Sequence, residues 1–219
     1  MDTCVVIERE KMRRFGSIAH FLAACLITVL TLQDVSGLEA EVRDISAEKY
    51  YEALHQAFKR AESSIYVAMF EIRIYSDRLS GPQYILLKDL IDAHKRGVKV
   101  RVYLDRSEDH DDATGLVSVH DVNGVAYDFL RKAGVDVRYA APTRRLHAKL
   151  VVIDERIVVD GSTNWSYSAL TKNAESATMI TSQQYALQKL QWMAKLRESN
   201  ADDRSDRDRS REVSKGKGP

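Results

Sequence analysis

The chain has 219 residues, of which 44% are hydrophobic and 30% are charged, as expected for one globular domain of ordinary size plus tails. The formal net charge of +1 excludes a strongly basic nucleic-acid binder of the histone kind, although it allows a local basic patch. The only two cysteines, Cys4 and Cys25, lie near the N-terminus, so the body of the protein has no disulfide framework or cysteine zinc site.

The N-terminal segment, residues 1–37, has the order of a secretory signal peptide. Basic residues, including Arg13 and Arg14, precede an uncharged apolar stretch over residues 18–32, and small residues follow it. Met12 offers an alternative start with a more ordinary basic region. We expect export, periplasmic or secreted, after cleavage. The alternative is an uncleaved membrane anchor, but the apolar run of about 15 residues is shorter than the roughly 20 that a comfortable span requires.

The first half of the body alternates helix and strand patterns. Its predicted elements are, in chain order, a helix that follows Ser46 and reaches Ala61, a strand over residues 64–70, a helix over 83–96 and a strand over 98–104. Ser46 is the expected N-cap of the first helix, and Gly97 is expected to end the second.

The second half continues this alternation. Its predicted elements are a helix over residues 122–133, a strand over 135–139, two strands of a hairpin over 146–153 and 156–160, a strand over 175–181 and a helix over 184–197. Strands separated by helices predict an α/β fold, with a mixed β-sheet sandwiched by helices in one domain over residues 38–198. The sequence has no internal repeat, so any two-fold construction must come from dimerisation.

Three segments lack periodicity. The polar connection over residues 105–121 is rich in Asp, Glu and His, which could hold a metal. Because their spacing matches no known ligand frame, we expect no metal and a solvated loop bordering the site. Residues 76–83 form a second bordering loop. Residues 199–219 alternate acidic and basic side chains and are expected to be a disordered charged tail.

The hairpin carries the residues suited to chemistry. Residues two apart in a strand share a face, so His147 and Lys149 point the same way. If residues 154–155 form a two-residue turn, Ile153 faces Arg156 and His147 lies opposite Ser162. This geometry would gather an imidazole, an ammonium group and a hydroxyl at the open end of the hairpin.

This set of side chains suits a phosphodiester. Imidazole acts readily as a nucleophile or general acid near neutral pH. Lys149, Ser162 and Asn164 can donate hydrogen bonds to the non-bridging oxygens, and one such preorganised donor is typically worth about 10²–10³ in rate. Gly161 would let the backbone come close to the bound group. No metal or other cofactor is required.

The motif resembles the HKD signature of the phospholipase D superfamily at every defined position, with the spacing His147-x-Lys149-x4-Asp154-x6-Gly161-Ser162-x-Asn164. The resemblance extends over most of residues 38–197. It is closest to small members with a single motif, the bacterial secreted endonucleases and the mitochondrial cardiolipin hydrolase type.

The resemblance implies a metal-independent phosphodiesterase. In that family a histidine attacks phosphorus to form a phosphohistidine, a second motif's histidine protonates the leaving group, and water resolves the intermediate. Because this chain has one motif, the resemblance implies a homodimer in which His147 of both copies completes the site. Glu175 matches the acidic residue that orients the nucleophile in the family.

The substrate is open between two classes. An endonuclease acting on DNA or RNA is favoured by Arg144 and Arg145 beside the motif, and by Arg106 and Lys172 in flanking loops. The alternative is a phospholipase D or cardiolipin hydrolase held at membrane phospholipids by residues 18–32. A second alternative is an inactive module that binds nucleic acid or lipid.

Overall fold

A computed structural model of the chain describes residues 37–75, 79–106, 108–110, 117–119, 122–141 and 145–196. The chain divides into residues 1–38 and a body that begins at Glu39. The expected leader up to residue 36, the charged tail and most of the acidic loop lie outside the described residues. Within the described ranges, no helix is long and apolar enough to cross a membrane.

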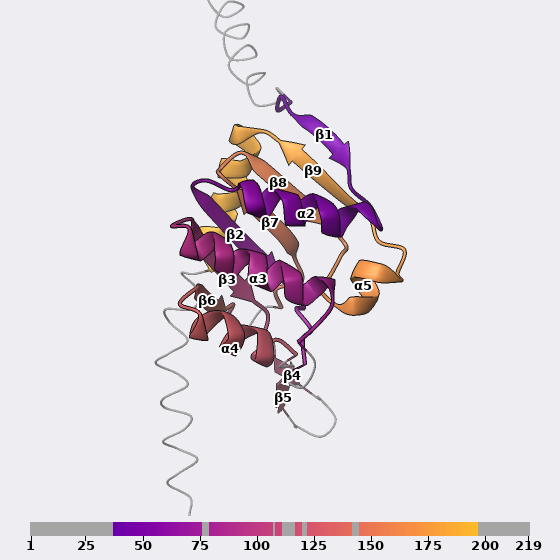
Figure 1. The fold of residues 1–219 in the computed structure, drawn as a ribbon, viewed down its shortest axis with the longest axis vertical. Helices are drawn as coiled ribbons and strands as arrows, with labels where there is room; N and C mark the ends of the chain where they lie inside the picture. The colour runs from indigo at the N-terminus through magenta and orange to yellow at the C-terminus, as the bar shows by residue number, and fades with distance from the viewer. Residues whose placement is uncertain are drawn as a thin grey trace, which may run out of the picture. The chain divides into compact units, whose positions relative to one another are not determined.

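The body is built on a seven-stranded mixed sheet in the order β1-β9-β8-β7-β2-β3-β6 (Figure 1). Its strands are β1 (Glu41–Asp44), β2 (Ser64–Met69), β3 (Lys99–Leu104), β6 (Asp136–Tyr139), β7 (Lys149–Ile153), β8 (Ile157–Gly161) and β9 (Ala177–Thr181). Neighbours from β1 to β2 pair antiparallel, whereas β2, β3 and β6 run parallel. A separate ribbon pairs β4 (Glu108–His110) with β5 (Val117–Val119).

Helices lie on both sides of this sheet. The helices are α2 (Lys49–Arg60), α3 (Pro82–Lys95), α4 (Gly124–Lys132), the short α5 (Tyr167–Thr171) and a helix over residues 183–196. The first three cover one face, and the helix over residues 183–196 lies behind the other (Figure 1). The predicted fold class, a mixed sheet sandwiched by helices in one domain, is confirmed.

Each face of the sheet has its own hydrophobic core, and β7 contributes to both. Val151 and Ile153 join the core beneath α2 and α3, whereas Leu150 and Val152 pack with Met193 of the opposite helix. All five β7 residues are buried. A strand covered on both faces requires a continuous apolar run, which explains why residues 150–153 do not alternate.

The hairpin register predicted from the sequence is wrong by one residue. Ile153 pairs with Ile157, and the turn has three residues, with Asp154 and Glu155 at φ values of 51° and 53°. The Asp154 carboxylate accepts hydrogen bonds at 2.8–3.2 Å from the backbone amides of residues 62–64, which precede and begin β2. This distant contact fixes the turn, and a shift of one residue changes which side chains share a face.

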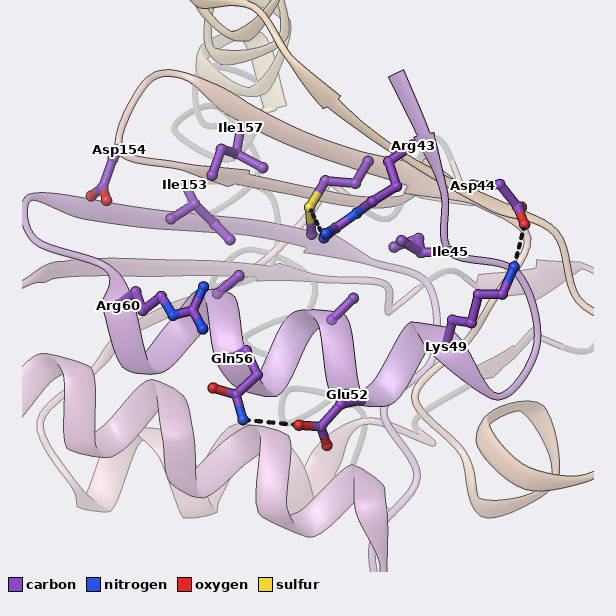
Figure 2. Close-up of a pocket in the computed structure, with 13 residues that line it drawn as sticks. Arg43, Asp44, Ile45, Lys49, Glu52, Gln56, Arg60, Ile153, Asp154 and Ile157 are labelled. Carbon is purple, nitrogen blue, oxygen red and sulfur yellow. Dashed lines mark hydrogen bonds and ion pairs between the residues drawn. The ribbon is translucent and has the colours of Figure 1, made fainter. Parts of the chain in front are cut away.

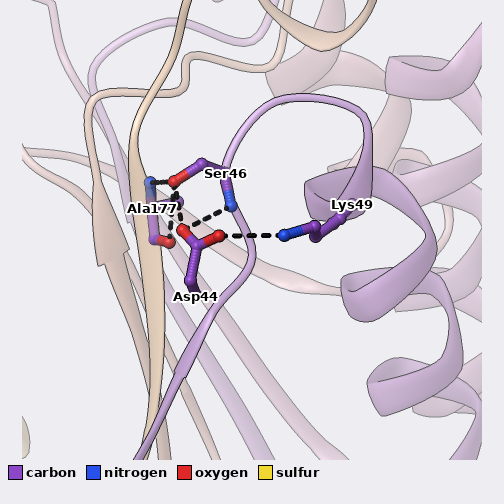
Figure 3. A network of polar contacts seen from close by, with 4 residues as sticks. All are labelled: Asp44, Ser46, Lys49 and Ala177. Atoms are coloured by element: carbon purple, nitrogen blue, oxygen red, sulfur yellow. Dashed lines mark hydrogen bonds and ion pairs between the residues drawn. The ribbon is translucent and has the colours of Figure 1, made fainter.

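The predicted N-cap of the first helix is also wrong. Helix α2 begins at Lys49 after Glu48, and Ser46 instead belongs to a polar network that joins β1 to β9 (Figure 3). The Ser46 hydroxyl accepts a hydrogen bond from the backbone amide of Ala177 at 3.2 Å and donates one to Asp44. Hydrogen bonds from Ser46, and then from Lys49, lower the pKa of Asp44 to about 2. The network thereby fastens the edge strand β1, a strand that was not predicted from the sequence.

Candidate active site

The predicted motif lies where β2 ends and β7 begins. Lys149, the first residue of β7, pairs with Met69, the last of β2. The backbone amide of Phe70 then donates to the carbonyl oxygen of Ala148 at 2.9 Å, so the segment that carries His147 runs beside the end of β2. The imidazole is exposed, whereas Lys149 is only 6% exposed.

Two buried polar residues hold this segment in place. The Asp105 carboxylate, just after β3, accepts a hydrogen bond from the backbone amide of Leu146 at 2.7 Å. The Asn123 side chain donates to the carbonyl oxygens of Phe70 at 2.9 Å and Asp105 at 2.8 Å. These hydrogen bonds connect the carboxyl ends of β2 and β3 to each other. The segment that carries His147 is hydrogen-bonded to both ends.

An ammonium, an imidazole and an aromatic ring meet at this point. Lys149 Nζ lies 3.4 Å from Nε2 of His147 and donates a hydrogen bond to the His147 carbonyl oxygen at 2.9 Å. The Phe70 ring centroid lies 4.6 Å from that of the imidazole, with the rings tilted by 52°. Lys149 Nζ lies 4.8 Å from the same Phe70 centroid. Phe70 therefore packs against both predicted catalytic side chains.

The charge of Lys149 is set by opposing effects. Burial lowers the pKa of the ammonium group below its usual 10.5, and the nearby carboxylates of Glu175, Glu71 and Asp105 oppose this shift. Three acidic groups thus act on the one buried cation of the motif. Neither Glu71 nor Asp105 belongs to the motif, and neither was predicted from the sequence as a site residue.

Ser162 and Glu175 form a contact of their own. The Ser162 hydroxyl donates to the Glu175 carboxylate, and the Asn173 side chain donates to the same carboxylate at 3.1 Å. Within the part of the chain that the structure describes, no hydrogen bond joins Glu175 to His147. The expected orientation of the imidazole by Glu175 therefore stays a prediction.

The corrected register changes the surroundings of the imidazole. Leu150 pairs with Asp160, so continuing the ladder brings Gly161 opposite Lys149, and the predicted position of Ser162 opposite His147 is wrong. A Cβ atom on Gly161 would lie only 2.7 Å from Cα of Ala177. The glycine therefore serves the close approach of β8 to β9, and the expected approach of a ligand at Gly161 stays a prediction.

The remaining two motif residues differ in placement. Asn164 follows β8 at the His147 end of the sheet, and its amide makes no hydrogen bond with any described residue; its oxygen is buried. Asp154 lies at the opposite end of β7, roughly 20 Å along the strand from His147 at about 3.3 Å per residue. The structure therefore does not bring Asp154 to the imidazole, and its contacts are those of a turn that is fastened to β2.

The predicted flanking cations lie beside aromatic rings. The Arg106 guanidinium lies 5.0 Å from the Tyr139 ring centroid, and Lys172 Nζ lies 5.5 Å from that of Tyr167. Arg145 is exposed, and Arg144 lies outside the described residues. Among the residues that are described, no three or more His, Cys, Asp or Glu side chains gather as a metal site would require.

Comparisons with known proteins match the body of the chain. The family model described as "Cardiolipin synthase, PLD-like domain" matches residues 54–197. Phospholipase D of Rickettsia prowazekii is 33% identical over 147 residues, which cover 67% of this chain and 62% of that protein. Mitochondrial cardiolipin hydrolase of Mus musculus is 28% identical over 139 residues, covering 64% of this chain and 54% of that protein. The matched segments thus span less than two thirds of these relatives.

Solved structures show the same fold at lower identity. Nuc from Salmonella typhimurium, a phospholipase D family member, superposes with a TM-score of 0.59 at 22% identity, covering 74% of this chain and 96% of that one. NucT from Helicobacter pylori gives a TM-score of 0.51 at 17% identity, covering 74% and 98%.

Proposed function

Because the chain belongs to the phospholipase D-like family, as the family-model match to residues 54–197 shows, we propose that it is a phosphodiesterase whose nucleophile is His147. The observation that carries this proposal is the exposed imidazole, which packs against the Phe70 ring and has a buried ammonium group 3.4 Å from its Nε2. A cation beside the attacked phosphate neutralises charge that develops in the transition state.

The proposed reaction has two steps, the formation of a phosphohistidine and its hydrolysis. A nitrogen of His147 attacks phosphorus, the bond to the leaving oxygen breaks, and that oxygen takes a proton from a second imidazole. Water then attacks the phosphohistidine, returns a proton to the second imidazole and breaks the P–N bond. Because the motif supplies one histidine, we assign the second imidazole to His147 of another copy in a homodimer.

Three side chains are suited to hold the phosphate in this scheme. Lys149 supplies the charge, Asn164 offers an amide that no described residue engages, and the exposed Ser162 hydroxyl can donate once its proton turns from Glu175 to a phosphate oxygen. The Glu175 carboxylate accepts the hydrogen bond of the Ser162 hydroxyl, and its charge favours the protonated form of Lys149. No step in this scheme uses a metal ion, so turnover is expected to persist in EDTA.

For the substrate we propose a nucleic acid, cleaved internally. The flanking pairs of Arg106 with Tyr139 and Lys172 with Tyr167 combine a cation with an aromatic face. Proteins that hold single-stranded nucleic acid use this combination for phosphates and bases. Membrane phospholipid is the second candidate, favoured by the names of the sequence relatives, phospholipase D and cardiolipin hydrolase.

One assay separates these substrates. The purified protein is incubated in EDTA with single-stranded DNA, RNA, cardiolipin vesicles and phosphatidylcholine vesicles, in parallel with His147→Ala. His94→Ala, which changes a histidine in the last turn of α3, is the matched control. We expect turnover of one substrate class that His147→Ala abolishes and His94→Ala retains, with a phosphohistidine trapped in acid-free denaturant. Equal turnover by His147→Ala would overturn the assignment.

A further inference from the structure

A cavity lies at the far end of β7 from the imidazole. This cavity of about 580 Å³ opens between α2 and strands β1, β9, β8 and β7 (Figure 2). Its lining shares only Asp154 with the HKD motif, at the far end of β7 from His147. The apolar residues of the lining are aliphatic or thioether side chains: Ile45, Ala53, Ala57, Ile153, Ile157 and Met179.

The carboxylates that line this cavity are all engaged. Asp44 is bound by Ser46 and by Lys49, whose ion pair spans 3.0 Å (Figure 3). Asp154 is bound by the backbone amides of residues 62–64, and Glu52 accepts a hydrogen bond from Gln56 at 2.8 Å. Among the described residues, none of these acids forms an ion pair with an arginine.

Two lining arginines consequently lack an anionic partner within the described residues. Arg43 lies opposite Met179 in the β1–β9 ladder, and its Nη2 contacts the Met179 sulfur at 2.9 Å, a weak acceptor for a guanidinium. Arg60 comes from the last turn of α2 and lines the same cavity, so the two cations enter from opposite walls (Figure 2). Guanidinium groups pair best with carboxylate or phosphate oxygens.

We propose that this cavity binds an anionic amphiphile with a single aliphatic chain, its head group between Arg43 and Arg60 and its chain along the aliphatic lining. The volume lies in the range of about 300–1,000 Å³ that is typical of small-molecule sites. None of the lining residues has an aromatic side chain on which a base could stack, so a nucleotide fits this site poorly. This site is independent of the proposed hydrolysis.

The test measures binding to the full chain by titration calorimetry. The probes are laurate and dodecyl phosphate below their micellar concentrations, with acetate and inorganic phosphate as head groups alone and dodecyl maltoside as a neutral chain. We expect saturable binding of one laurate or dodecyl phosphate per chain, and weak binding of the other probes. Tighter binding of laurate identifies a free fatty acid, and tighter binding of dodecyl phosphate identifies a phosphate lipid.

Variants locate the binding. The double change Arg43→Gln and Arg60→Gln should weaken the preferred probe by at least about tenfold, as expected for charge-assisted hydrogen bonds. Lys59→Gln, an exposed neighbour outside the lining, is the matched control and should bind normally. Ala57→Phe should fill the cavity and abolish binding. If this variant fails to fold, the affinity of the double arginine variant is the test. Unchanged affinity in the arginine variant, or equal binding of dodecyl maltoside, would overturn the proposal.

Discussion

Lys149 holds the nucleophile proposed here at two points, since its Nζ donates to the backbone carbonyl oxygen of His147 at 2.9 Å and lies 3.4 Å from the imidazole Nε2. In the proposed mechanism the same cation would lie beside the phosphate oxygens.

We expect the alkaline limit of activity to report the titration of Lys149. Because burial lowers the pKa of this ammonium group, the proton should leave below the usual 10.5, and activity should fall as the pH rises through that lowered pKa. Lys149→Met should reduce kcat by about 10²–10³. Lys149→Arg should move the alkaline limit upward, because arginine keeps its proton. The measurement is kcat/KM against pH; an alkaline limit at the same pH in Lys149→Arg contradicts this assignment.

Asp154 should matter for stability far more than for chemistry. Asp154→Ala removes the acceptor of three backbone amides and should cost about 1–3 kcal/mol in free energy of unfolding, measured in urea. Burial works to raise the pKa of the Asp154 carboxyl, but the amides outweigh it and hold the pKa below 3.8. The stabilisation should therefore be complete above pH 3.8 and disappear as the pH falls through the lowered pKa.

The control for Asp154 is the kinetics of the folded variant. Since the carboxylate lies at the far end of β7 from His147, kcat of folded Asp154→Ala should stay within about threefold of the kcat of the unsubstituted protein. A loss comparable to that of Lys149→Met would assign Asp154 a role in the chemistry.

The buried strand β7 could be predicted from the sequence, whereas the exposed strand β1 could not. The apolar run of residues 150–153 predicted β7 because a doubly covered strand admits few other side chains. Strand β1 was not predicted, since all four of its residues are exposed and only its ladder with β9 makes it a strand. The hairpin register was not predictable either, because Asp154 is fixed by Ser64, 90 residues earlier in the chain.

The part of the candidate site that comes from residues close together in the sequence could be predicted. The spacing of His147 and Lys149 placed both groups together, which the 3.4 Å contact confirms. Phe70 and Asp105 were missed because they reach the site from the ends of other strands. A usable signal did exist: each follows a parallel strand, and sites in such sheets lie at the carboxyl ends of the strands.

Phe70 should position the imidazole without touching the substrate. Phe70→Leu removes the ring that packs against His147 and Lys149, so the imidazole gains rotational freedom. We expect kcat to fall about tenfold with little change in KM. The NMR chemical shifts of the His147 imidazole should also change, because the Phe70 ring no longer packs against it. Phe70→Tyr should restore both values; a change in stability alone would indicate a purely structural ring.

Gly161 should be intolerant of any side chain. A Cβ atom there would lie 2.7 Å from Cα of Ala177, and the backbone of β9 cannot yield as a side chain could. Gly161→Ala should therefore cost about 1–3 kcal/mol, measured as the midpoint of urea unfolding. Gly37→Ala, whose added Cβ would meet nothing within 4 Å, is the control and should unfold as the original does. Equal midpoints for the two variants would show that β8 and β9 are not this close.

Mixing protomers should reveal whether two copies build one site. If both imidazoles of a dimer are needed, an equal mixture of the original and His147→Ala protomers, after exchange, leaves only about a quarter of the dimers with both. Activity should then drop to about half of that of the same two proteins assayed without exchange. The exchange is followed by light scattering and by mass spectrometry of a tagged protomer. Activity that stays additive after complete exchange means that each chain acts alone, and the second imidazole must then be sought within the same chain.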